Sequence, residues 1–225
     1  MIGFYNYTVF LTYLSLISGT LGIVISLSGN GHPFIGSFFL LFSGLCDAFD
    51  GKVARTKPNR TSKDQKFGIQ IDSLSDLVAF GVLPACIGAA MFRGMSLKGK
   101  TATNVYTVLL FAVISVYVLA ALIRLAYFNV TEEERQQTET GSRKRYTGLP
   151  VTSAALIFPT VLLVNFLVKA DITPIYLAVM VFTAFAFVSK IEITKPGIKG
   201  ILILVGIGAA EFVAIFLLKV LKIFV

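Results

Sequence analysis

The sequence predicts an all-α fold, a polytopic transmembrane helical bundle. Hydrophobic residues make up 56% of the 225 residues, whereas charged residues make up only 14%. The mean hydropathy of +0.81 lies outside the range of an ordinary soluble domain. Apolar stretches recur along the chain at roughly the 20-residue length that a membrane-spanning helix needs. Little sequence is therefore left for a separate soluble domain.

Seven apolar runs are the candidate membrane spans. They cover residues 8–28, 33–50, 68–92, 104–128, 150–169, 173–189 and 200–224. Glycine and proline separate several of them: residues 29–33 predict a tight connection, Pro174 restarts a helix, and residues 196–197 break the chain before the last run. Because the last run ends in lysines, it is either a seventh span or a helix lying in the membrane interface.

The basic residues concentrate in the connections between these runs. The chain has 20 Lys and Arg against 12 Asp and Glu, a net charge of +8 that in a soluble protein would suggest nucleic acid. Most of these basic residues fall in connections on one side of the membrane, so the positive-inside rule accounts for the charge. We expect this side to face the cytosol and the chain to lie in the cell membrane, with no nucleic-acid partner.

Four aspartates lie at the junction of the second and third runs. Asp47 and Asp50 stand at the end of the second run, and Asp72 and Asp76 stand near the start of the third. Spacings of three and four residues place each pair on one helical face, and a short connection makes the two helices antiparallel neighbours. The sequence therefore predicts one cluster of four carboxylates.

A divalent cation is the simplest explanation of such a cluster. Carboxylates this close, next to a low-dielectric medium, would lose their charge unless a cation lay among them. Oxygen ligands alone favour hard ions such as Mg²⁺ or Mn²⁺, which often bind substrate phosphates as well. The alternative is that the aspartates are solvated helix ends that pair with the basic connection.

Small residues and one arginine accompany the aspartates. Gly51 and Ala54 share the helical face of the first pair, and Gly68 lies one turn before the second. They leave space for a bulky ligand beside the backbone. Arg55 offers a planar set of donors that suits a phosphate group.

These residues form a continuous pattern. In order it consists of Asp47-x-x-Asp50-Gly51-x-x-Ala54-Arg55 and Gly68-x-x-x-Asp72-x-x-x-Asp76. The pattern resembles the signature of the CDP-alcohol phosphatidyltransferase family, membrane enzymes that move a phosphatidyl group from a CDP-linked lipid to an alcohol. The resemblance implies a six-helix core within residues 1–191, an extra C-terminal transmembrane or interfacial helix within 192–225, and a homodimer. One departure is that the connection 56–67 is longer than the usual family pattern.

Further segments resemble the phosphatidylserine synthase branch of that family. They are residues 72–85, 123–129, 148–150 and 187–191. In the first run, Ser15 stands where that branch often has an asparagine. The resemblance implies direct transfer of the phosphatidyl group from CDP-diacylglycerol to L-serine, which releases phosphatidylserine and CMP.

The resemblance also implies roles for individual residues. The four aspartates would hold two Mg²⁺ or Mn²⁺ ions, and Asp76 would be the base that takes the serine proton. The residues implied to bind the CDP-lipid are Asp50, Gly51, Ala54, Arg55 and Gly68.

Serine brings a carboxylate to an acidic site, so we expect a cation near it. Arg124 lies inside an apolar run, where a charge is costly and often functional, unless it extends to the interface. Arg143, Lys144 and Arg145 are further candidates, although a basic loop can also simply contact anionic lipid headgroups. Asn129 is included as a position that matches the branch.

Other functions remain open at this stage. The acceptor could instead be glycerol 3-phosphate or an inositol phosphate, and the donor could be an ether lipid. A divalent-ion transporter is the rival from another class, but it would place its acids near the membrane midplane, often in repeated halves. Glu211, the acidic residue within the last run, is interpreted as a helix-packing or interface contact and not as a second site.

Overall fold

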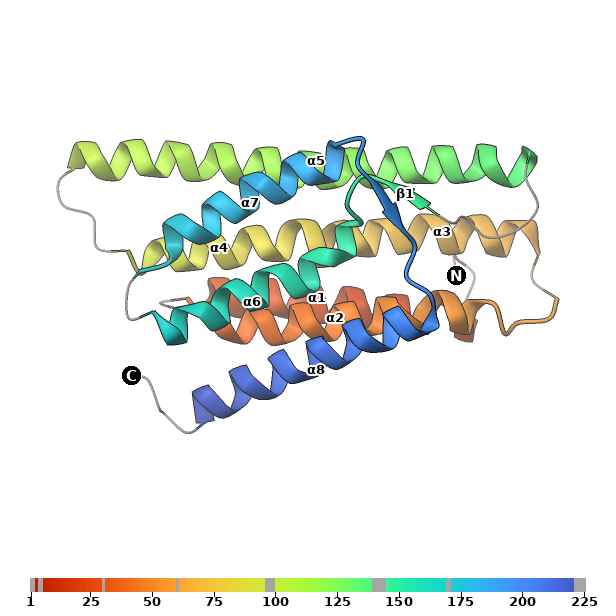
Figure 1. Cartoon of the computed structure of the whole chain (residues 1–225), viewed down its shortest axis with the longest axis horizontal. Coiled ribbons are helices and arrows are strands. Elements are labelled where there is room, and N and C mark those ends of the chain that lie inside the picture. The colour runs from red at the N-terminus through yellow and green to blue at the C-terminus, as the bar shows by residue number, and fades with distance from the viewer. Residues whose placement is uncertain are drawn as a thin grey trace.

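The computed structural model of the protein is a bundle of helices that run roughly along one axis (Figure 1). Its α-helices are α1 (Phe10–Leu27), α2 (Pro33–Ala54), α3 (Ser62–Asp76), α4 (Leu83–Arg93), α5 (Lys100–Thr138), α6 (Ala154–Leu167), α7 (Thr173–Val188) and α8 (Ile198–Val220). Shorter elements are η1 (Tyr7–Val9), η2 (Leu77–Val82), η3 (Val151–Ser153), β1 (Arg145–Thr147) and β2 (Glu192–Thr194). The predicted all-α bundle is confirmed.

The structure describes most of the chain. The described residues are 3, 6–29, 31–59, 61–95, 100–138, 145–168 and 171–220, without the side chains of 100–103, 136–137, 165–167, 198 and 218–220. All statements below concern these residues.

Five helical segments of the described chain are long and apolar enough to cross a membrane. They are Tyr7–Leu27, Pro33–Ala54, Ser62–Arg93, Asn104–Arg135 and Lys199–Leu217, and two shorter apolar helices cover Val151–Val164 and Thr173–Val188. The last apolar run of the sequence is thus long enough for a span. The chain is a multi-pass membrane protein.

Several helices extend beyond the apolar runs. The second helix continues to Ala54, and the third begins at Ser62, well before the apolar run 68–92. Thr61 and Asp64 form a reciprocal cap at this start, in which each side chain accepts a hydrogen bond from the backbone N–H of the other. Hydropathy marks only the buried length of a helix, so it misses polar ends that caps stabilise.

A π-helical segment, η2, joins α3 to α4 within one continuous helix. Pro84 has no N–H, so the carbonyl of Phe80 lacks its α-helical partner. The hydroxyl of Tyr117 in α5 donates to this carbonyl instead (2.7 Å). Tyr117 also lies in an aromatic core with Phe158 and Tyr176, where neighbouring ring centroids are 5.5 and 5.0 Å apart. This core packs the middle of the bundle.

Small and hydroxylated residues bring α1 close to its neighbours. A Cβ at Gly19 would lie 3.0 Å from Cα of Ala79, so glycine permits the close approach of α1 to η2. Ser18 donates to the carbonyl of Phe39 (2.8 Å), which joins α1 to α2. Such close backbone approach and interhelical hydrogen bonds are the usual means of packing helices in membranes.

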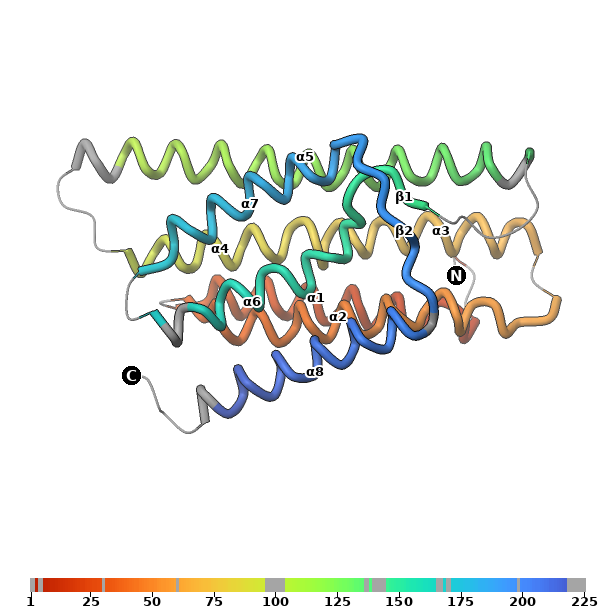
Figure 2. The backbone as a smooth tube through the Cα atoms, in the orientation of Figure 1, coloured from red at the N-terminus to blue at the C-terminus, as the bar shows by residue number. Residues whose placement is uncertain are grey.

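Two features were not predicted or were left open by the sequence. Strands β1 and β2 pair antiparallel with Tyr146 opposite Ile193, in the half of the bundle that contains the start of α3 (Figure 2).

Helix α8 packs against α2 and α6, where the rings of Phe38 and Phe212 lie 4.8 Å apart. Glu211 of α8 is buried and hydrogen-bonded to Thr160 of α6, which agrees with the packing contact expected of it.

Candidate active site

The ends of α2 and α3 bring three of the predicted aspartates together. Asp47, Asp50 and Asp72 each offer one carboxylate oxygen, and these oxygens lie within 4.8 Å of one another. The last turns of α2 supply two of them and the antiparallel α3 supplies the third. This spacing suits a shared cation, because hard cations take several oxygen ligands at short distances.

Asp76 lies one turn beyond Asp72 on the same helix. It is buried, and its acidic neighbours are Asp47, Asp72 and Asp50. It is not one of the three residues whose oxygens meet within 4.8 Å. Asp76 therefore lies beside this group, further along α3 from the end at which that helix begins.

One carboxylate oxygen of the cluster is buried without a partner. Oδ1 of Asp72 has no hydrogen-bond partner among the described residues. A buried oxygen of this kind carries a desolvation cost of about 1–3 kcal/mol. A divalent cation would supply the missing partner, with this oxygen as one of its ligands, so the donor set and the orphaned oxygen both fit Mg²⁺ or Mn²⁺.

A hydroxyl from α1 orients the cluster. Thr12 donates its Oγ1 proton to Oδ2 of Asp50 (3.2 Å), and Ser75 Oγ donates to the backbone carbonyl of Thr12 (3.1 Å). Both contacts are buried, and together they join α1, α2 and α3 at the site. Sequence reasoning missed Thr12; the available signal was its hydroxyl, three residues before Ser15 in the same apolar run.

Ser15, which replaces the asparagine of the branch, lies away from the carboxylates. Its hydroxyl donates to the carbonyl of Ser43 (3.4 Å), and the hydroxyl of Ser43 donates to the carbonyl of Ser15 (3.0 Å). These reciprocal bonds hold α1 against α2. Ser15 thus supports the helix pair that carries Asp47 and Asp50.

The residues expected to bind the CDP-lipid lie toward the outer end of the two helices. Ala54 and Gly68 are half-buried, and Arg55 is exposed. The guanidinium of Arg55 lies near Gly51, since a Cβ at this glycine would be 3.5 Å from Nη1. The guanidinium of Arg55 thus lies back along α2, over the turn that contains Gly51.

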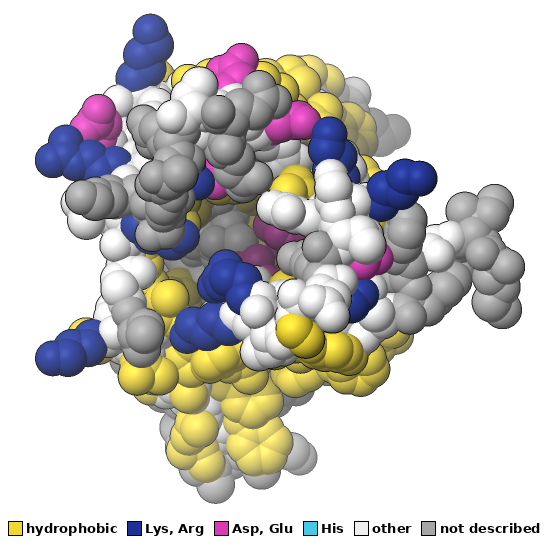
Figure 3. Space-filling model, turned by 90° about the vertical axis from the view of Figure 1, so that its right-hand side faces the viewer, with side chains coloured by type: hydrophobic (Ala, Val, Ile, Leu, Met, Phe, Trp, Pro, Cys, Tyr) yellow, Lys and Arg dark blue, Asp and Glu magenta, His cyan; other side chains and the backbone are white. Residues whose placement is uncertain are grey.

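The end of the bundle is hollowed at the site. Figure 3 shows acidic side chains inside the hollow and many Lys and Arg side chains around its rim, with some Asp and Glu among them. Charges of one sign that line an entrance attract ligands of the opposite sign. The basic rim thus favours an anionic ligand, and the acidic interior favours a cation.

Arg124 is buried in α5 and does not extend to the surface. Its Nε donates to the carbonyl of Leu149 (3.2 Å), its Nη2 donates to the carbonyl of Gly148 (3.4 Å), and its guanidinium lies 5.6 Å from the ring centre of Phe128. Gly148 has a φ of +80°, and a Cβ there would lie 2.6 Å from the carbonyl oxygen of Phe187. Only glycine fits this corner.

The other expected serine-binding residues lie in different surroundings. Asn129 donates to Oγ of Ser73, next to Asp72 on α3 (2.8 Å). Arg145 forms an exposed ion pair with Glu192 (2.8 Å) across the β1–β2 pair. Arg143 and Lys144 lie outside the described residues.

The fold and site define an integral membrane protein with a carboxylate site open at one end of a helical bundle. Residues 5–189 match the CDP-alcohol phosphatidyltransferase family, and the chain belongs to this family. The family match and the three-aspartate group together support metal dependence.

The sequence is also similar to several named proteins. The chain is 37% identical over 155 residues to the CDP-diacylglycerol–serine O-phosphatidyltransferase of Saccharomyces cerevisiae, covering 66% of this chain and 50% of the yeast protein. It is 32% identical over 138 residues to the enzyme of the same name from Helicobacter pylori (61% of this chain, 50% of the relative). It is 32% identical over 174 residues to an archaetidylserine synthase from Methanothermobacter thermautotrophicus (76% and 64%).

The chain spans about half to two thirds of the length of these relatives. No solved structure matches the sequence.

Proposed function

We propose that the protein transfers the phosphatidyl group of CDP-diacylglycerol to the hydroxyl of L-serine and releases CMP. The observation that supports this proposal most strongly is the group Asp47, Asp50 and Asp72. Their carboxylate oxygens lie within 4.8 Å of one another, at the junction of the two helices that contain the family pattern. The names of the relatives support serine as the acceptor.

The four aspartates would hold the divalent ions, Mg²⁺ or Mn²⁺, of which we propose two. Bound there, these ions would neutralise the diphosphate of the donor and the charge that builds up on the departing CMP. Asp72 is suited to ligation through its unpartnered oxygen, and Thr12 fixes the orientation of Asp50. Asp47 and Asp76 would complete the set from the inner turns.

The donor would lie over the outer turns of the same helices. Its diphosphate would meet the guanidinium of Arg55, while the small residues Gly51, Ala54 and Gly68 would admit the nucleotide beside the backbone. Binding in this way would place the diphosphate between Arg55 and the aspartates. Positioning of this kind contributes much of the rate in phosphoryl-type transfers.

The reaction is one direct displacement. The serine oxygen forms a bond to the lipid-side phosphorus, and the bond from that phosphorus to the oxygen of CMP breaks. Asp76 takes the hydroxyl proton, and CMP leaves as an anion with the bonding electron pair. Asp76 is buried beside the other aspartates, where the proposed step needs an acceptor for the serine proton.

Arg124 is our first candidate for the serine carboxylate. It is a buried cation held in place by the carbonyls of residues 148–149. Asn129, through Ser73, connects α5 to the helix of Asp72 and Asp76. Arg143, Lys144 and Arg145 remain secondary candidates within the same proposal.

We further propose that the site faces the cytosol at the cell membrane and that the protein is a homodimer. The basic rim around the hollow supports a cytosolic orientation. The division into a catalytic domain, 1–191, and an added helix, 192–225, belongs to the same proposal and agrees with a family match that ends at residue 189.

An ether-lipid donor is the second candidate, because one relative is named archaetidylserine synthase. The test incubates purified protein with ester- or ether-linked CDP-lipid, Mg²⁺ or Mn²⁺, and labelled serine, glycerol 3-phosphate or inositol phosphate. We expect labelled phosphatidylserine and equimolar CMP from the ester donor. Product from another acceptor but none from serine would refute the proposed acceptor, and no product from any acceptor would refute the transfer itself.

A further inference from the structure

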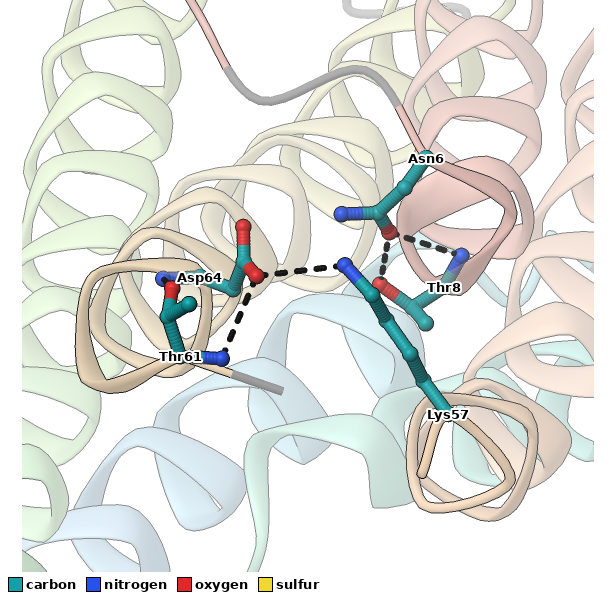
Figure 4. A network of polar contacts seen from close by, with 5 residues as sticks. All are labelled: Asn6, Thr8, Lys57, Thr61 and Asp64. Carbon is teal, nitrogen blue, oxygen red and sulfur yellow. Dashed lines mark hydrogen bonds and ion pairs between the residues drawn. The ribbon is translucent and has the colours of Figure 1, made fainter. Parts of the chain in front are cut away.

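An ion pair joins the connection between α2 and α3 to the first turn of α3. Nζ of Lys57 lies 3.1 Å from Oδ2 of Asp64, and the side chains are only 25% and 10% exposed. The same carboxylate oxygen accepts the backbone N–H of Thr61 (3.3 Å). Figure 4 shows the Lys57 ammonium directed toward Asp64, with the Asn6–Thr8 pair on its other side.

The first residues of the connection are also held. Thr56 Oγ1 donates its proton to the carbonyl of Val53 (2.8 Å), so the Tyr7 hydroxyl is the donor in its contact with Thr56 (3.2 Å). Both ends of the connection are therefore fixed, one to the segment before α1 and one to the first turn of α3. This is the connection that is longer than the family pattern.

The position of the ion pair relates it to the donor site. On α3, Asp64 continues the row of every fourth residue that contains Gly68, Asp72 and Asp76. Lys57 lies just beyond the end of α2, two residues after the C-cap Arg55. Along the two helices, Ala54 and Gly68 thus lie between the ion pair and the carboxylate cluster.

We propose that the Lys57–Asp64 pair is a positioning element that closes the outer side of the nucleotide site and holds Arg55 and the first turn of α3 around the CDP part of the donor. This inference rests on the proposed function, because it assumes that a CDP-linked lipid binds between α2 and α3. It assigns a role to the lengthened connection of this chain.

The test separates the ion pair from the helix cap that shares Asp64. Lys57→Met removes the ion pair and keeps the cap, whereas Thr61→Ala removes the side-chain cap and keeps the ion pair. We expect Lys57→Met and Asp64→Asn to raise the KM for CDP-diacylglycerol roughly threefold to tenfold, with kcat and the serine KM unchanged. Thr61→Ala should lower the melting temperature without changing the donor KM.

Two controls make this outcome specific. Asp64→Glu retains both the charge and the cap, so it should keep the wild-type donor KM. Lys66→Met breaks the exposed Lys66–Glu133 pair (3.2 Å) on the outer surface and should leave the donor KM unchanged. The double variant of Lys57 and Asp64 should raise the donor KM no more than Lys57→Met alone, since the Lys57–Asp64 pair is already lost in that variant.

An unchanged donor KM in Lys57→Met, or an equal rise in Thr61→Ala or Lys66→Met, would overturn the positioning role. Direct binding keeps this result separate from the proposed function. If the wild-type protein makes no phosphatidylserine, the proposed acceptor fails, but its thermal stabilisation by CDP-diacylglycerol can still be compared with that of Lys57→Met. Equal stabilisation of the two proteins would then overturn the inference alone.

Discussion

The hydrogen bond from Thr12 to Asp50 offers a sharp test of how the carboxylate cluster is organised. Replacing Thr12 by Val keeps the shape of the side chain and removes the donor to Oδ2 of Asp50. Hydrogen bonds to charged groups contribute about 1.5–3 kcal/mol. At 3.2 Å this bond is long, so we take the lower value. A loss of about 1.4 kcal/mol corresponds to a tenfold change, so kcat/KM for phosphatidylserine formation should fall roughly tenfold.

The assay measures labelled phosphatidylserine at varied CDP-diacylglycerol with saturating serine. Thr12→Ser keeps a hydroxyl and should recover most of the activity. Thr20→Val is the matched control, because Thr20 lies on the same helix, is exposed and donates only to the carbonyl of Leu16. Wild-type kcat/KM in Thr12→Val, or the same loss in Thr20→Val, would refute the reasoning.

Three further predictions address the base, the acceptor and the core. Asp76→Asn should abolish turnover but retain CMP binding measured by calorimetry, and full activity would remove Asp76 from the mechanism. Arg124→Ala should raise the serine KM roughly tenfold or more, as for loss of a charge-assisted contact, while the donor KM stays constant; an unchanged serine KM would exclude the carboxylate contact. Tyr117→Phe leaves the Phe80 carbonyl without its partner and should destabilise the fold by about 1–3 kcal/mol, seen as a lower melting temperature, so an unchanged value would contradict the role of this bond.

Much of the helical architecture could be predicted because hydropathy follows burial in the membrane. The first and last residues of the helices were harder to predict from the sequence. Helix α3 begins at Ser62 because Thr61 and Asp64 cap it, and α5 continues to Thr138 with Arg135 paired to Glu132 at 2.6 Å. Such local polar contacts extend a helix past its apolar run. The three-residue strands β1 and β2 are too short to give a periodic signal.

Part of the candidate site could likewise be predicted from the sequence, and part could not. The spacing of Asp47, Asp50 and Asp72 predicted a cluster because helix periodicity fixes which residues share a face. Thr12 was missed because its partner depends on how α1 packs against α2, which no local pattern encodes. Arg124 was recognised as a buried charge, but its carbonyl partners depend on the turn at residues 148–149.

Helix α8 is long and apolar enough to cross a membrane, and a crossing would carry the chain to the other face of the bilayer. Figure 1 shows α8 running from the half of the bundle that contains the start of α3 toward the opposite end. A reporter domain fused after α8 would therefore sample the compartment across the bilayer from the carboxylate hollow. Removing α8 before the fusion should return the reporter to the compartment of the hollow, so a pair of such fusions tests whether α8 crosses the membrane, without any enzyme assay.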